Sequence, residues 1–236
     1  VEDENLAESM LVVDGSNHGV VVDGLTSLKI EDTLVVNGSS DNDTIDVADY
    51  ISTDGGFTAS DSAIVFGGAG DDSIALSDAS ETVQFSGSAI ANGQDTITGF
   101  DLAEDVLDLQ AINGGAASVA SLAVGFTDDA DSNVDLSAGN NIAGLITANG
   151  ELAAGSVALV TKATTPGDGS DDQVLIADGG SAVVAVANGA NATSFNLYAV
   201  SDSDGNNVNG AITAQVDLIG TIGVADYASL TANDFA

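Results

Sequence analysis

The sequence predicts an all-β protein, in which a parallel β-solenoid or β-roll is followed by a β-sandwich-like domain. Three observations lead to this prediction. Short apolar segments of Val, Ile, Ala and Thr recur along the 236 residues, and these residue types favour strands. The segments are separated by turns built on Gly, Asn and Asp, with 28 Gly and 1 Pro in the chain. Apolar and polar residues alternate with period 2 at 44–47 and 73–76, which is typical of half-buried strands.

The first half of the chain contains a repeating unit of apolar strand, glycine turn, polar loop and apolar strand. Four copies lie at 11–22, 34–47, 63–76 and 82–100. A repeat of this length predicts a solenoid over residues 11–112, with two or three strands per turn, because each unit must bury its apolar face on its neighbours. The stretches near 48–62 and 77–82 are expected to be loops. Residues 1–10 are acidic and predict a tail, or an edge strand donated to a neighbouring molecule.

The third copy contains the most specific motif of the chain, Gly67-Gly68-Ala69-Gly70-Asp71-Asp72-Ser73-Ile74-Ala75. It fits the pattern G-G-x-G-x-D-x-U-x, where U is a large apolar residue, at every position. Its glycines permit a tight turn that directs main-chain carbonyl groups inward, and Asp72 adds a carboxylate. Calcium prefers six to eight oxygen ligands, so the loop is suited to this ion. Here the chain resembles the RTX (repeats-in-toxin) family of calcium-binding β-rolls.

Partial copies of the motif extend the resemblance. Asp43 and Asp95 stand at the position of Asp72, at spacings of 29 and 23 residues, so one turn of the solenoid is longer than two nonapeptides. Because only one copy is complete, we expect few ions. A degenerate copy at 167–174 contributes Asp172, although a polar hairpin loop explains that segment equally well. The expected calcium ligands are Gly38, Asp41, Asp43, Gly67, Gly68, Ala69, Gly70, Asp71, Asp72, Gly93, Asp95 and Asp172.

Two further segments resemble proteins of the type I-secreted class. Residues 92–101, followed by the acidic-apolar strand at 104–109, resemble the segment that closes their β-rolls. The acidic-then-apolar end, 229–236, resembles their uncleaved export region, and the alternative is a last edge strand. The Gly- and Ala-rich stretch 114–118 breaks the repeat, which predicts a domain boundary at about residue 112.

Residues 113–236 predict a second β-rich domain. Asn188-Gly189 between apolar segments favours a hairpin, and short helices are expected at 116–124 and 142–154. The expected strands are 156–161, 173–177, 182–187, 194–200, 211–219 and 227–230.

Other acidic loops are weaker metal candidates. Residues 129–133 begin like an EF-hand loop, but Val134 and Asn140 stand where glycine and glutamate are required. We therefore expect at most a weak oxygen site there, and the same holds for the acidic turn 202–206.

Charge and composition exclude several classes of function. With 37 Asp and Glu against 2 Lys and Arg, the net charge of −35 argues against nucleic acid and anionic membranes as partners. Such a chain repels itself until cations neutralise it. No cysteine is present for disulfides, and no apolar run is long enough for insertion into a membrane.

An enzyme is not expected. His18 is the single histidine, which leaves too few ligands for zinc and no support for a Ser-His-Asp triad. Acidic pairs abound, but no feature singles out a glycosidase dyad, and the chain has no Trp for stacking on sugars.

These observations predict a non-enzymatic, calcium-dependent structural protein, secreted to the extracellular space or cell surface. A type I exporter would release it unfolded, calcium would fold it outside, and copies would assemble into a surface layer, filament or biofilm matrix. Its expected partners are other copies of itself, the exporter in passing and, as a further candidate, a cell-surface polysaccharide. The alternative is a folding and export module at the C-terminal end of a larger secreted hydrolase or adhesin.

Overall fold

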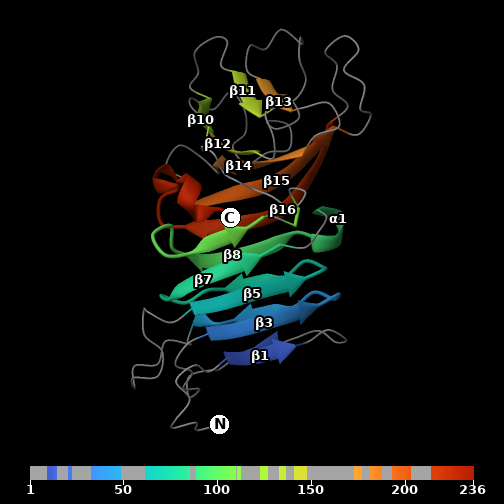
Figure 1. Cartoon of the computed structure of the whole chain (residues 1–236), viewed down its shortest axis with the longest axis vertical. Coiled ribbons are helices and arrows are strands. Elements are labelled where there is room, and N and C mark those ends of the chain that lie inside the picture. Colours follow the sequence, from blue (N-terminus) through green and yellow to red (C-terminus); the bar gives the residue numbers. More distant parts are fainter. Residues whose placement is uncertain are drawn as a thin grey trace.

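The first half of the chain alternates between two sheets. The computed structural model describes residues 10–14, 21–22, 33–48, 62–85, 89–109, 111–112, 123–126, 133–136, 141–147, 173–176, 181–187, 193–202 and 214–236. Odd-numbered strands form one five-stranded parallel sheet in the order β1-β3-β5-β7-β9 (Figure 1). These strands are β1 (Met10–Asp14), β3 (Thr33–Ser39), β5 (Ser62–Gly68), β7 (Ser80–Gln84) and β9 (Val106–Asp108).

Even-numbered strands lie in the second sheet and are also parallel to one another. They are β2 (Val21–Val22), β4 (Thr44–Asp46), β6 (Ser73–Ala75) and β8 (Asp95–Phe100). One strand of each sheet with the connecting turns is called a coil below. The turn from the first sheet to the second is the first corner, and the turn back is the second corner.

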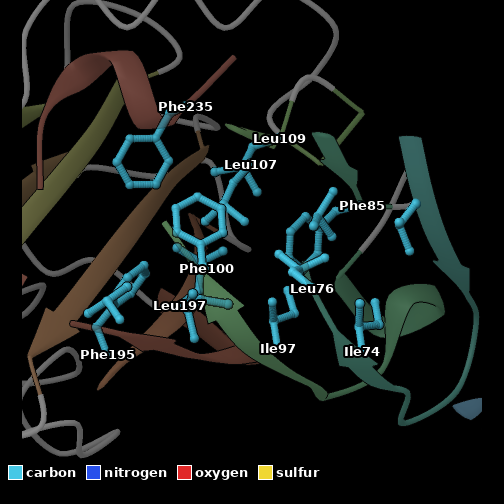
Figure 2. Packing of buried hydrophobic residues seen from close by; sticks show 14 of the residues in the cluster. Ile74, Leu76, Phe85, Ile97, Phe100, Leu107, Leu109, Phe195, Leu197 and Phe235 are labelled. Carbon is cyan, nitrogen blue, oxygen red and sulfur yellow. The ribbon is translucent and has the colours of Figure 1, made fainter. Parts of the chain in front are cut away.

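The core lies between the two sheets, where the same kind of residue recurs in each coil. Residues of β3 and β5 alternate between partly exposed and buried positions, as the period-2 pattern predicts. Strand register then aligns Ile45, Ile74 and Ile97 in one buried column. Figure 2 shows Ile74 and Ile97 in the same interior as Phe85. Each such side chain contributes about 1.5–3 kcal/mol when fully buried, so stacking of coils is the main source of stability here.

The second sheet continues into the C-terminal half of the chain. Strand β16 (Ala214–Val224) is parallel to β8 and antiparallel to β15 (Ser194–Asp202), which pairs antiparallel with β14 (Ser181–Ala187). Beyond β14 lie β12 (Asn141–Thr147) and β10 (Ala123–Phe126), both parallel. The resulting nine-stranded sheet crosses the boundary expected at residue 112. Strands β11 (Asn133–Leu136) and β13 (Gln173–Ile176) form a separate parallel pair.

The last residues of the chain close the end of the first sheet. The Leu109 main-chain N–H donates to the Ala236 carbonyl (2.9 Å), and the Ala236 N–H donates to the Leu107 carbonyl (3.0 Å). Phe235 is buried beside them and lies near Phe100 in the core (Figure 2). Strand β9 therefore gains a second neighbour from the C-terminus.

The all-β prediction is confirmed at the level of class: the described residues are mostly strand, in parallel and mixed sheets. The four-residue helix α1 (Ala89–Asn92) and the 3₁₀ turns η2 (Tyr227–Ser229) and η3 (Ala232–Asp234) are short exceptions. The antiparallel pair β14–β15 agrees with the hairpin expected from Asn188-Gly189. No helix of the described residues is long and apolar enough to cross a membrane.

Four local predictions were wrong. The last residues of the loop expected near 77–82 belong to β7, which begins at Ser80 and pairs with β5. The helix expected at 142–154 is the strand β12 over 141–147, because its main chain pairs with β10 and β14. The end of the helix expected at 116–124 lies in β10. The strand expected at 227–230 is η2, because the Asp226 side chain accepts from the Ala228 N–H and starts a tight turn. The strand expected at 156–161, the rest of both helices and residues 1–9 lie outside the described residues.

Candidate metal centre

Three aspartates form a column at the first corner. Asp43, Asp72 and Asp95 each stand directly before or at the start of a strand of the second sheet, and the register of β4, β6 and β8 places them at equivalent positions. All three are buried. The Asp43 N–H donates to Asp72 Oδ1 (2.8 Å), and the Asp72 N–H donates to Asp95 Oδ1 (3.2 Å). The carboxylates of Asp72 and Asp95 thus each hold the main chain of the preceding coil, and the three aspartates together are called the aspartate column.

Glycine is required at this corner for two reasons. Gly68 has φ of 109°, a left-handed conformation that other residues rarely adopt. Gly67 leaves room for a carboxylate: a Cβ atom there would lie 3.1 Å from Cγ of Asp72 and closer still to its Oδ2. The glycine pattern therefore allows the acid to fold back against its own turn.

The second carboxylate oxygen distinguishes the three aspartates. Oδ2 of Asp43 accepts from the Ser39 N–H (2.6 Å), and Oδ2 of Asp95 accepts from Asn92 Nδ2 (2.8 Å). Oδ2 of Asp72 is buried and has no hydrogen-bond partner. A buried oxygen without a partner costs about 1–3 kcal/mol of stability when nothing compensates it. Asp72 is therefore the member of the column whose second carboxylate oxygen is open to a ligand.

Electrostatics also favours a cation here. Burial raises the pKa of Asp72 to about 6, and repulsion from the charges of Asp43 and Asp71 also raises it. The hydrogen bond from the Asp43 main chain lowers this pKa, but its effect is smaller than that of burial. Burial likewise raises the pKa of Asp95 to about 7, although hydrogen bonds from the Asp72 main chain and from the Asn92 side chain lower it. The described ranges contain no Lys, Arg or His, so no side chain there supplies positive charge.

Other predicted ligands surround this column. Asp71 is exposed, and its Oδ1 accepts from the Gln94 N–H (2.9 Å), while its own N–H donates to Asn42 Oδ1 (3.0 Å). Gly38 and Gly93 lie so close to Gly67 and Gly70 of the next and preceding coils that a Cβ atom would overlap their carbonyl oxygens. The turn therefore brings main-chain carbonyl groups close to the column.

The remaining predicted ligands lie at the edge of the corner or outside the described residues. Asp41 is exposed, and its N–H donates to Ser39 Oγ (3.0 Å). Ala69 and Gly70 complete the turn, where the Ala69 N–H donates to the Ser39 carbonyl (2.9 Å). Asp172 belongs to a segment that is not described.

The donor set at Asp72 fits a hard cation. The vacant Oδ2 is a ligand atom of the kind that calcium prefers, and the glycine turns add carbonyl oxygens nearby. Within the described ranges, no group of three or more acidic, His or Cys side chains converges on a single point. An ion at Asp72 would therefore take most of its ligands from the main chain and from water.

Sequence reasoning missed two parts of this architecture. Asn92 lies at the end of the aspartate column and links it to β16. Its Nδ2 donates to Oδ2 of Asp95 and to the Ile219 carbonyl (3.3 Å) on β16. At the second corner, Glu81 and Asp105 form a further buried acidic pair. Glu81 follows Asp72 by nine residues, the length of one motif, and this spacing is the signal that could have revealed it.

Comparisons with known proteins do not assign this chain to a family. The sequence matches no protein-family model, and neither the curated proteins nor the solved structures contain a match.

Proposed function

We propose that residues 11–112 form a calcium-binding parallel β-solenoid of the β-roll type, and that calcium binding drives its folding. The alternation of strands between two parallel sheets supports this proposal, as does the repetition of one acid at the same position of successive coils. The C-terminal strands would form the second, sandwich-like part of the protein, joined to the coils through β16.

One observation carries the proposal: the partnerless Oδ2 of Asp72, buried in a part of the chain that has no basic side chain. Such an oxygen needs a cation or a proton. A bound calcium ion would supply two positive charges at the column and neutralise the repulsion from Asp43 and Asp71. Because the unfolded chain lacks the site, binding would add directly to the stability of the folded state.

On this basis the protein is a calcium-dependent extracellular structural protein, exported by a type I system and assembling with its own copies outside the cell. Millimolar calcium outside cells would fold it there. The charge of −35 keeps copies apart in the absence of divalent ions. Lys on an edge strand blocks pairing with another chain, and this chain has almost no Lys, so its strand edges would be able to pair between copies. A surface layer, filament or biofilm matrix would be the product, with a cell-surface polysaccharide as a further partner, and we assign no catalytic role.

The test is assembly under defined ions. Light scattering and electron microscopy of the purified chain should show ordered multimers in millimolar calcium, and monomers in chelator or in isotonic sodium chloride. Sodium screens charge over a Debye length of about 8 Å but does not bridge carboxylates of two chains. If the chain folds on adding calcium yet remains monomeric at every concentration, the folding and export module of a larger protein replaces the structural role.

A further inference from the structure

The second corner contains a buried acidic pair that lies away from the aspartate column. Glu81 precedes the residues of β7 that pair with β9, and the register of Thr82 with Val106 places Glu81 beside Asp105. Glu81 is 0% exposed and Asp105 is 2% exposed. The Glu81 N–H donates to Asp105 Oδ1 (2.8 Å), so the two residues are joined in the same way as consecutive members of the column.

The two carboxyl groups differ in their partners. Asp105 accepts a main-chain N–H at each oxygen, since the Asp101 N–H donates to its Oδ2 (2.8 Å). This environment suits a carboxylate. Oε1 of Glu81 accepts from the Ser77 hydroxyl, whereas its Oε2 is buried without any partner. An ionised Glu81 would therefore leave a bare charged oxygen next to a second carboxylate.

No positive side chain relieves this repulsion. The charged group that acts on Glu81 is Asp105 from the turn before β9, and Asp101 from the same turn acts on Asp105. On the other side of Glu81, the register places Ala63 of β5, which carries no charge. The acids Asp78 and Glu104 of the two turns are exposed, and Lys, Arg and His are absent from the described part of the chain.

We propose that Glu81 and Asp105 share one proton at neutral pH, with Glu81 as the carboxylic acid and Asp105 as the carboxylate. A proton on Oε2 converts the bare oxygen into a donor, and the adjacent carboxylate of Asp105 accepts from it. The shared proton then links the two carboxyl groups of the second corner by a hydrogen bond, and no metal ion is needed there.

The electrostatics of the pair agrees with this assignment. Burial raises the pKa of Glu81 to about 8, with further contributions from Asp105. Burial also raises the pKa of Asp105 to about 6, but the N–H groups of Asp101 and Glu81 act in the opposite direction. The proton therefore belongs to Glu81, and it leaves only as the pH rises above neutrality.

This proton makes the stability of the fold depend on pH between about 4.5 and 8. In the unfolded chain Glu81 loses its proton near pH 4.5, whereas in the folded chain it keeps the proton until about pH 8. Between these values the folded state binds more protons than the unfolded state, so stability falls as the pH rises. The unfolding equilibrium constant should rise by up to about tenfold per pH unit from this one group.

The experiment measures urea unfolding between pH 6 and 9 for the wild-type chain and for Glu81→Gln, in calcium-containing buffer throughout. The Gln side chain keeps the shape and supplies an N–H donor toward Asp105, so the stability of this variant should fall less steeply than that of the wild-type chain between pH 6 and 8, with the remaining slope coming from Asp72, Asp95 and Asp105. The matched control is Glu104→Gln, an exposed acid of the second corner that should keep the wild-type slope. A Glu81→Gln variant with the wild-type slope would refute the shared proton.

A second measurement requires no folded variant. Infrared difference spectra of the wild-type chain in calcium-containing buffer, where the proposed ion replaces protons at the aspartate column, should show the carbonyl band of a buried carboxylic acid at pH 7, which disappears as the pH passes about 8. Absence of that band at pH 7 would overturn the proposal.

Discussion

Replacement of Gly67 by alanine tests the calcium site with the smallest possible change. The residue does not have the positive φ of Gly68, so its main chain accepts an alanine without strain. The added Cβ would overlap Oδ2 of Asp72, the oxygen to which we assign the ion. The substitution therefore fills the ligand position and leaves the charge of the protein unchanged.

The cost follows from the contacts. To reach ordinary van der Waals distance, the Asp72 carboxylate must move by about 1 Å, and such overpacking costs about 1–3 kcal/mol. The same movement would stretch the 2.8 Å bond from the Asp43 N–H beyond hydrogen-bond range. An unpaired buried N–H costs about 1–3 kcal/mol more. We expect a total loss of about 4 kcal/mol, which lowers the Tm of a chain of this size by roughly 10 °C.

The assay combines thermal unfolding by circular dichroism with calcium titration calorimetry. Gly223→Ala is the matched control, because a Cβ atom there would have its nearest neighbour, the Ile97 carbonyl oxygen, at 3.5 Å. The control should unfold and bind calcium like the wild-type chain. If Gly67→Ala binds calcium with wild-type affinity and is as stable as the control, the assignment of the ion to Asp72 is refuted.

Two further substitutions test the roles assigned within the aspartate column. Asp72→Asn should weaken calcium binding in calorimetry by at least tenfold, whereas Asp78→Asn, an exposed acid of the second corner, should leave it unchanged; equal effects would contradict the site. Asn92→Ala should destabilise the fold by about 1–3 kcal/mol in urea, because Oδ2 of Asp95 and the Ile219 carbonyl lose a shared donor. A change below about 0.5 kcal/mol would show that Asn92 does not hold the end of the column.

The column itself could be predicted from the sequence because its signal is local. Each aspartate stands in a turn shortly before an apolar residue that enters the core, and Asp43, Asp72 and Asp95 recur once per coil, each just before or at the start of a strand of the second sheet. Parallel stacking then places equivalent residues side by side. The vacancy at Asp72 could not be predicted, since it depends on Ser39 and Asn92 satisfying the other two acids.

Strand pairing between distant segments explains the helix that was wrongly expected at 142–154 and the acidic pair that the sequence did not reveal. The segment at 141–147 contains Ala, Gly, Leu and Ile, a composition that permits helix or strand, and pairing with both β10 and β14 decides for strand. Glu81 does not match the motif residue for residue, so only the register of β7 and β9 reveals that it faces Asp105. Residues paired across long sequence distances are those that a local pattern does not identify.

The pairing of β8 with β16 has a consequence for the order of folding. Neighbouring coils join residues that are 23 to 29 positions apart, as in the bonds within the aspartate column. Strand β16, in contrast, places Gly220 opposite Asp95, 125 positions earlier in the chain. Closing a loop of that length costs more entropy than adding a coil, and long-range parallel pairing is slow. The coils should therefore form first, and β8 should remain an open edge until β16 docks, so this junction is where a refolding chain is most exposed to aggregation.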